Sequence, residues 1–177
     1  MTIIVRDGSE ADIDGIAKVH VQGWRESYKD ILTPQALAGP SAEERVRMWR
    51  DILAAPDPRA KLLVAETGGA IVGFARGGPV RPATPDLLAT ETEIFAIYLL
   101  DGVKRQGIGR KLMAGVFDHL AGQGFRSAGL WVLKDNASAC RFYEALGGRA
   151  GPERPFDMPG QRLTKIAYRF EPIPRSA

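Results

Sequence analysis

The stretch EIFAIYLLDGVKRQGIGRK, residues 93–111, decides how the rest of the chain is interpreted. Its apolar first half predicts a strand over 93–100, and a glycine-containing basic loop then opens a helix. Gly107 and Gly109 let backbone N–H groups come close to a ligand, and the unpaired N–H groups that begin the helix would point toward it. Four basic residues belong to the same loop: Lys104, Arg105, Arg110 and Lys111. We therefore expect a site for a phosphorylated ligand here.

The elements on either side of this stretch predict the fold. A second buried strand over 129–133 completes a strand, helix, strand unit, so these two strands should be parallel. Earlier in the chain, Thr67-Gly68-Gly69 separates β-rich runs over 61–66 and 70–76, which predicts an antiparallel hairpin. Further strands are predicted over 2–6 and 163–170. We expect an α/β (α+β) fold: a central mixed, mostly antiparallel sheet of about six or seven strands with helices on both faces.

Helix and loop signals fill the remaining segments. Ser9, with Asp12 three positions on, predicts a helix start, and the apolar stripe that begins at Ile13 predicts a helix that ends near Gly23. A second helical piece is predicted over 24–32. A capping box at Ser41–Glu44 predicts the start of another helix. The proline-rich segment 77–92 is predicted to be a loop, and the Gly/Pro-rich segment 149–161 is predicted to be a strand end and a loop.

Composition limits the class of protein. With 177 residues and 45% hydrophobic content, the chain predicts one domain over residues 1–177. The chain has 24 basic and 21 acidic residues, and the basic residues do not form a run. A dedicated nucleic-acid binder is therefore disfavoured. The single cysteine excludes an internal disulfide framework and a cysteine-rich zinc site, and we expect no metal. No apolar run approaches the roughly 20 residues that span a bilayer, so we expect a cytoplasmic protein without a membrane partner.

Several phosphate-binding motifs can be compared with the loop. A Walker-type loop fails because Ile108 and Gly109 occupy the positions of its Lys and Ser/Thr. A dinucleotide fingerprint lacks its third glycine, since position 112 is Leu112, although Asp135 stands at a plausible distance after the second strand. A basic helix start without any ligand is the structural alternative.

The segment Lys104-Arg105-Gln106-Gly107-Ile108-Gly109 resembles the acyl-coenzyme A loop of the GNAT family of N-acetyltransferases. The family pattern is Arg or Gln, two residues, Gly, any residue, then Gly or Ala, so Lys104 departs from it while keeping the positive charge. A second block, residues 130–148, resembles the family's strand, Asn-capped helix and Phe-Tyr-Glu sequence before a glycine. The predicted order of elements agrees over nearly the whole chain.

This resemblance implies a function. The protein would transfer an acetyl group from acetyl-CoA directly to a primary amine of a small molecule or peptide, in a ternary complex. Coenzyme A would lie where the sheet splays between strands 93–100 and 129–133. Its binding residues would be the backbone groups of Ile97, Tyr98 and Leu99, the loop residues Lys104, Arg105, Gln106, Gly107, Ile108, Gly109 and Arg110, and Asn136. The family often forms dimers, so a homodimer is possible.

Two residues are expected to act in catalysis. Asn136 and Tyr143 are seven apart, which places them on one helix face about 10 Å apart along the axis. The resemblance implies that Tyr143 donates a proton to the departing thiolate; packing is the alternative. Glu93, expected on the same strand face as Ile97 and Leu99, would take the amine proton through water.

The acceptor is not specified by the sequence. Its pocket is expected from segments 24–31, 77–92 and 149–161. Trp24 and Tyr28, four apart on one helix face, would either pack on the core or line this pocket. Two other functions stay open: a non-catalytic acyl-CoA sensor, and a nucleic-acid binder that uses the basic cluster at 104–111.

Overall fold

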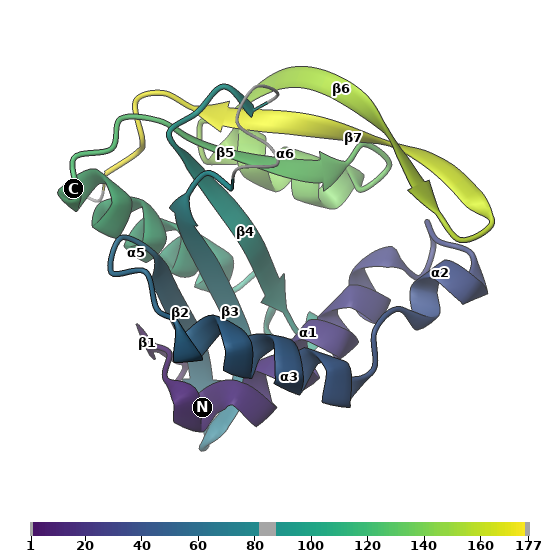
Figure 1. Ribbon diagram of the computed structural model, residues 1–177, viewed down its shortest axis with the longest axis horizontal. Helices are drawn as coiled ribbons and strands as arrows, with labels where there is room; N and C mark the ends of the chain where they lie inside the picture. Colours follow the sequence, from purple (N-terminus) through teal and green to yellow (C-terminus); the bar gives the residue numbers. More distant parts are fainter. Residues whose placement is uncertain (1, 82–87, 176–177) are drawn as a thin grey trace.

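A seven-stranded sheet in the order β1-β2-β3-β4-β5-β7-β6 runs through the molecule (Figure 1). The computed structural model describes residues 2–81 and 88–175. The strands are β1 (Ile4–Asp7), β2 (Lys61–Thr67), β3 (Ala70–Pro79), β4 (Thr92–Leu99), β5 (Ala128–Leu133), β6 (Arg149–Met158) and β7 (Gln161–Phe170). The helices are α1 (Ile13–Tyr28), α2 (Pro34–Ala38), α3 (Ala42–Ala54), α5 (Ile108–Gly122) and α6 (Ala137–Ala145), with short 3₁₀ turns η1 (Glu10–Asp12) and η2 (Asp101–Val103).

The predicted fold class is confirmed. The β4–β5 pair is parallel, and the other neighbouring pairs of strands are antiparallel. Helix α5 connects the two parallel strands, which is the predicted βαβ unit (Figure 1). Gly68 and Gly69, with φ of 55° and 78°, form the hairpin turn between β2 and β3, as their freedom from a Cβ allows.

Helices cover both faces of the sheet. The side chains of α5 and α6 pack on one face in a cluster that includes Leu112, Val116, Phe117, Val132 and Tyr143. On the other face, α1 and α3 enclose a cluster that includes Ile16, Trp49 and Phe74. A smaller cluster at the α2 end joins Leu32, Ala36, Leu133 and Leu163.

The start of α3 is the predicted capping box. Ser41 Oγ accepts from the Glu44 backbone N–H at 3.2 Å, and the Glu44 carboxylate accepts from the Ser41 backbone N–H at 2.7 Å. The two side chains therefore satisfy backbone donors that the first helical turn would otherwise leave unpaired.

The prediction that the first helix ends near Gly23 is wrong, because α1 continues without a break to Tyr28. A Cβ atom at position 23 would lie 3.1 Å from both Cβ and Cδ1 of Tyr98. Gly23 therefore lets α1 lie close to β4 and does not end the helix.

The segments 77–92 and 149–161 contain more strand than predicted. Residues 149–158 form β6, an edge strand with a register shift between Ala150 and Glu153. Pro152 and Pro155 fit there because an edge strand can leave one row of positions without ladder hydrogen bonds. In the segment 77–92, residues 77–79 belong to β3 and Thr92 to β4, while residues 82–87 lie outside the described residues.

Candidate active site

A gap opens in the sheet between β4 and β5. These strands are paired only at Thr92–Ala128 and Glu93–Gly129. Beyond Glu93, the edge of β4 that faces β5 has no partner strand in the described chain. A cavity of about 120 Å³ lies at this splay. It is lined by Ser27, Tyr28, Ile94, Phe95, Ala96, Ile97, Tyr98, Leu130, Trp131, Val132, Asn136, Ala139 and Tyr143.

The cavity has walls from both faces of the sheet. Ile97, Val132 and Tyr143 belong to the cluster under α5 and α6. Tyr28 and Tyr98 belong to the clusters under α1, α2 and α3. A space with walls from both layers connects the two sides of the sheet where its ladder is interrupted.

The basic loop ends at the start of α5. Gly107, with φ of 79°, is the N-cap residue of α5 and supplies no side-chain cap, so the first N–H groups of the helix stay available to a ligand. A Cβ atom at Gly109 would lie 3.2 Å from Phe142 Cζ, so this glycine permits close contact with α6. Arg110 Nη2 donates to the Ala145 carbonyl at 3.3 Å, which also ties α5 to α6.

The other side chains of the loop differ in their exposure and in whether they have a partner. Lys104 Nζ forms an ion pair with Asp101 at 2.7 Å, so its charge is partly compensated. Arg105, with φ of 60°, and Gln106 are exposed next to Gly107. The predicted loop thus presents backbone N–H groups and exposed side chains around one point.

Helix α6 positions Asn136 and Tyr143. Asn136 Oδ1 accepts from the Ala139 backbone N–H at 3.1 Å, which is the predicted N-cap. Tyr143, on the same helix, is 8% exposed, and burial raises the pKa of its phenol. Within residues 2–81 and 88–175, the Tyr143 hydroxyl forms no hydrogen bond. A protonated phenol therefore faces the cavity with its donor unused.

Two more phenols line the same cavity. Burial raises the pKa of both Tyr28 and Tyr98, and hydrogen bonds to Tyr98 and Asn136 partly offset the rise at Tyr28. Trp24 is not among the cavity's lining residues; its ring lies 4.6 Å from that of Tyr28, in the cluster at the α2 end. Of the two aromatic candidates of α1, Tyr28 is the one at the cavity.

The expected placement of Glu93 on the face of Ile97 and Leu99 is wrong. The β3–β4 ladder shifts register where Arg76 faces Ala96 and Gly77 faces Ile94, which leaves Phe95 as an extra residue. Such a bulge reverses the alternation of faces. Ile94 accordingly shares a cluster with Ile97 and Leu99.

The Glu93 side chain is 3% exposed and forms an ion pair with Arg81. Phe95 lies beside this pair, with the Arg81 guanidinium 5.2 Å from its ring centroid. Phe95 lines the cavity, so the carboxylate lies next to one cavity wall. Among the described residues, Glu93 and Asp12 are the buried carboxylates, and Asp12 pairs with Arg6.

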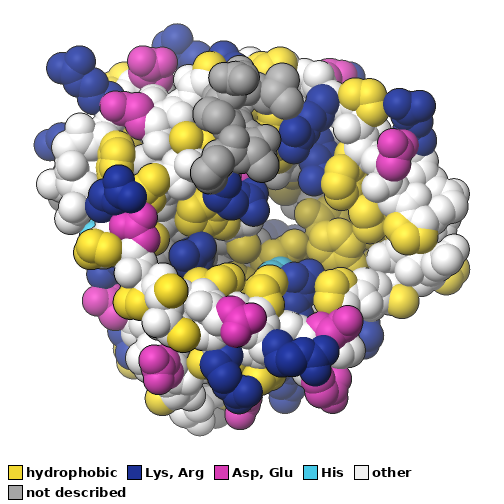
Figure 2. All heavy atoms as spheres, in the orientation of Figure 1, with side chains coloured by type: hydrophobic (Ala, Val, Ile, Leu, Met, Phe, Trp, Pro, Cys, Tyr) yellow, Lys and Arg dark blue, Asp and Glu magenta, His cyan; other side chains and the backbone are white. Residues whose placement is uncertain are grey.

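Sequence reasoning did not single out three cations near the cavity walls: Arg76, Arg154 and Lys165. Arg76 lies over the Phe95 ring at 4.8 Å, and Arg154 lies over the Trp131 ring at 4.3 Å. Lys165 faces Arg154 directly across the β6–β7 ladder. We call these three residues the cationic rim. Figure 2 shows a hollow at the centre of one face of the molecule with Lys and Arg side chains around it.

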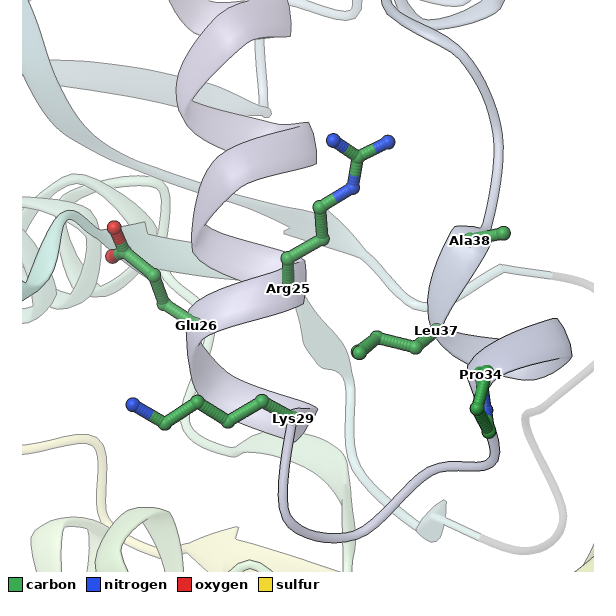
Figure 3. A pocket seen from close by; sticks show the side chains of 6 residues that line it. All are labelled: Arg25, Glu26, Lys29, Pro34, Leu37 and Ala38. Carbon is green, nitrogen blue, oxygen red and sulfur yellow. The ribbon is translucent and has the colours of Figure 1, made fainter.

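A larger hollow of about 480 Å³ lies elsewhere, between α1 and α2 (Figure 3). Leu37 points from α2 toward α1, whereas Glu26 and Lys29 point away from α2. None of the predicted catalytic or coenzyme A residues lines it. The smaller cavity therefore remains the candidate site, because the phenols and the interrupted strand edge are there.

Metal-binding clusters and membrane-spanning helices are both absent from the part of the chain that the structure describes. No group of three or more His, Cys, Asp or Glu side chains there could hold a metal ion. None of the helices described is both long and apolar enough to cross a membrane.

Comparison with known proteins decides the family. The model of the acetyltransferase (GNAT) family matches residues 22–148, which is more than half of the chain and includes the loop, the splay and α6. The chain belongs to the acetyltransferase (GNAT) family. The predicted family is confirmed, and with it the class of enzyme.

Individual relatives agree with this membership. The uncharacterized N-acetyltransferase YuaI of Bacillus subtilis is 32% identical over 164 residues, covering 93% of this chain and 90% of YuaI. The structure of yncA from Salmonella typhimurium with acetyl-CoA has a TM-score of 0.74 at 17% identity, covering 100% and 98% of the two chains. The PaiA N-acetyltransferase of Thermoplasma acidophilum, in complex with coenzyme A, has a TM-score of 0.68 at 18% identity, covering 94% and 98%. At these identities the two solved structures share the GNAT fold with this protein.

Proposed function

We propose that this protein transfers an acetyl group from acetyl-CoA to a primary amine, directly and within a ternary complex. The observation that carries the proposal is the cavity between β4 and β5, whose walls come from both faces of the sheet. Two substrates can meet in such a space from opposite sides. A direct transfer needs this arrangement, because amine and thioester must be held together without water between them.

Acetyl-CoA would bind on the α5 and α6 side. The unpaired edge of β4, at Ile97, Tyr98 and Leu99, offers backbone groups to the pantetheine amides. The start of α5 at Gly107 offers N–H groups to the pyrophosphate. Asn136 and Tyr143, on one face of α6, would follow the arm toward the thioester. The yncA structure with acetyl-CoA and the PaiA structure with coenzyme A support this choice of donor, since both have the same fold as this protein.

The reaction forms one bond and breaks one. The neutral amine nitrogen attacks the thioester carbonyl carbon, and the carbon–sulfur bond then breaks with its electron pair on sulfur. The amine proton leaves through water to Glu93. Each step moves charge within a cavity that has many apolar side chains in its walls, where positioned hydrogen bonds act more strongly than in water.

The role of Tyr143 follows from its environment. An ordinary phenol has a pKa of about 10 and a thiol one of about 8.5, so full proton transfer from phenol to thiolate is uphill. Burial raises the pKa of Tyr143 further, which makes the transfer still less favourable. We infer that its hydroxyl stabilises the departing thiolate as a hydrogen-bond donor and keeps its own proton, while the amine proton goes to Glu93.

A thiol-release assay tests this function. Acetyl-CoA is incubated with the protein and a library of primary amines, free coenzyme A is detected colorimetrically, and mass spectrometry identifies the acetylated amine. We expect acetylation of at least one amine and a sequential kinetic pattern. Thermal stabilisation by acetyl-CoA without turnover on any amine would instead support the acyl-CoA sensor.

A further inference from the structure

We propose that the acceptor carries an anionic group, a carboxylate or a phosphonate or phosphate, in addition to its amine, and that the cationic rim binds this group. The inference rests on the proposed acetyltransferase function and names the substrate class of the same site. It is carried by three half-buried cations beside the cavity, none of which forms an ion pair with a described residue.

Arg154 and Lys165 are the first part of the argument. They are direct partners in the β6–β7 ladder. Like charges placed directly opposite one another destabilise a pair of strands. Neither side chain forms an ion pair with a described residue, although Lys134 and Glu153 pair nearby at 2.7 Å. The folded protein therefore holds two repelling cations together without an ion pair to either of them within the described chain.

Arg76 supplies the third charge from a different part of the sheet. Its guanidinium lies 4.8 Å from the Phe95 ring centroid and is half-buried, and it also forms no ion pair with a described residue. Arg81, which holds Glu93, repels it. A cation in such a place is poorly solvated and would gain from an anionic ligand.

The rim borders the cavity on two walls. Arg76 lies against Phe95 of β4, and Arg154 lies against Trp131 of β5. Both rings line the cavity. Lys165 stands beside Arg154 and feels the charges of both Arg81 and Glu93, which places it between the two walls. An acid group bound by the rim would thus lie at the entrance from the α1 face.

The buried carboxylate of Glu93 fits the other half of such an acceptor. Glu93 attracts an ammonium group, whereas the rim attracts an acid group. This distribution of charge is complementary to a zwitterion, with its nitrogen near Glu93 and its acid group at Arg154 and Lys165. A diamine or a neutral amine would leave the rim uncompensated.

The charge state of Lys165 agrees with this assignment. Burial, with repulsion from Arg154 and Arg81, lowers the pKa of Lys165 to about 8, against a partial opposing effect of Glu93. A bound anion would favour the protonated form, so binding and protonation support one another.

Stacking of arginines on aromatic rings is the structural alternative. Cation–π contacts contribute about 0.5–2 kcal/mol each and need no ligand. They account for Arg76 on Phe95 and Arg154 on Trp131, and Lys165 Nζ likewise lies 3.3 Å from the Phe156 ring centroid. Cation–π contacts neutralise no charge, however, so the like charges of Arg154 and Lys165 still face one another across the ladder. This difference makes Arg154 and Lys165 the residues to test.

The experiment compares matched acceptors. Amino acids, their carboxamides and aminoalkylphosphonates of equal chain length are assayed for coenzyme A release by the wild-type protein. Arg154→Gln and Lys165→Met are then compared with Lys18→Met, which removes an exposed charge on α1. We expect the anionic acceptors to be preferred, and each rim variant to lower their kcat/KM by about tenfold while leaving the carboxamides and Lys18→Met nearly unchanged. The phosphonate and carboxylate arms distinguish the two kinds of acid group.

A binding measurement separates the inference from the proposed function. N-acetylated amino acids and N-acetylated carboxamides are titrated calorimetrically into the protein saturated with coenzyme A. If the acids bind more tightly than the carboxamides and Lys165→Met loses this difference, the inference is supported. It would be supported even if the protein acetylated no amine, because the absence of acetylation would refute only the enzyme function. Equal binding of acids and carboxamides, or equal losses for both in the rim variants, would overturn the inference.

Discussion

Arg81 holds the carboxylate of Glu93 through both of its oxygens: Nε donates to Oε2 at 3.0 Å, and Nη2 donates to Oε1. The ion pair fixes the orientation of Glu93 next to Phe95. We infer that Arg81 positions Glu93 and that Glu93 receives the amine proton.

Replacing Glu93 by Gln should remove this base while keeping the shape of the side chain. We expect kcat/KM at pH 7 to fall by about 100-fold, at the lower end of what general bases contribute. The defect should shrink as the pH rises toward the pKa of the amine, because the acceptor then arrives already neutral. The pH–rate profile of Glu93→Gln checks this.

Glu153→Gln is the matched control, since Glu153 forms an exposed ion pair with Lys134. It should leave the profile unchanged. A Glu93→Gln defect that stays constant at every pH would assign Glu93 a structural role only, and a thermal melt of the variant shows whether the fold is retained.

The pKa of Lys165 predicts a pH dependence of binding. Lys165 is protonated below about pH 8 and loses its charge above it, because burial and the charges of Arg154 and Arg81 outweigh the attraction of Glu93. We expect the affinity for an N-acetylated amino acid, which has no titrating amine, to fall several-fold between pH 7 and pH 9. Calorimetry across this range measures it.

Lys165→Arg should abolish that dependence, since a guanidinium stays charged throughout. If the wild-type affinity is constant from pH 7 to pH 9, Lys165 does not bind the acid group.

The close contact between Gly23 and Tyr98 predicts that a larger residue at position 23 lowers the stability of the fold. A Cβ atom there would lie 3.1 Å from Tyr98 Cβ, so Gly23→Ala must move α1 or the Tyr98 ring. We expect a loss of about 1–3 kcal/mol in the free energy of unfolding, as for other overpacked contacts. Urea denaturation provides the value.

Gly122→Ala is the control, because a Cβ atom at Gly122, at the end of α5, meets nothing within 4 Å. Alanine should be neutral or stabilising there, by up to about 1 kcal/mol. Similar losses for both variants would show that Tyr98 is not the cause.

The environment of the Asp12 carboxylate predicts that the stability of the fold decreases at acidic pH. Its carboxylate accepts from Arg6 at 2.8 and 2.9 Å and from the Ser9 backbone N–H at 2.9 Å, and the Arg6 hydrogen bonds in particular lower its pKa from 3.8 to about 2. A lowered folded-state pKa contributes stability that is present above pH 3.8 and is lost as the pH falls toward 2. We expect Asp12→Asn to cost about 1–2 kcal/mol at pH 7, allowing for the partial exposure of Arg6.

The cost of Asp12→Asn should largely vanish near pH 2, which denaturation curves at two pH values can show. Asp14→Asn, at an exposed position in the first turn of α1, should change stability by only a few tenths of a kcal/mol. A cost for Asp12→Asn that is the same at both pH values would exclude the ion pair as its source.

The features that the sequence predicted well are local. The capping box at Ser41, the Gly68-Gly69 turn and the Asn136 cap each depend on residues within a few positions, and all three appear as predicted. Gly23 was misread because its neighbour, Tyr98, is 75 positions away in the chain. The cationic rim was not predicted for the same reason: its residues come from β3, β6 and β7 and are far apart in the sequence. Within each strand they alternate with ordinary strand residues.

The site was partly predictable for the same reason. The loop at Gly107 and the helix with Tyr143 are each continuous motifs. The face of Glu93 was mispredicted because the bulge at Phe95 depends on pairing with β3, which strict alternation along β4 does not reveal. Cytoplasmic location, a homodimer and the catalytic roles of Tyr143 and Glu93 stay predictions.

Tyr143→Phe tests the proposed chemistry most directly, because it removes one hydroxyl and keeps the ring. Tyr168→Phe is its control: Tyr168 is also buried, but its hydroxyl donates to Glu144 at 2.7 Å and does not line the cavity. Both variants are compared in kcat for the best acceptor and in the dissociation constant for acetyl-CoA.

The decisive measurement is this pair of constants for Tyr143→Phe. If the hydroxyl stabilises the departing thiolate, kcat falls by about 10- to 100-fold while the dissociation constant for acetyl-CoA changes less than about twofold. An unchanged kcat would remove Tyr143 from the reaction and contradict acetyl transfer at the cavity between β4 and β5 as described.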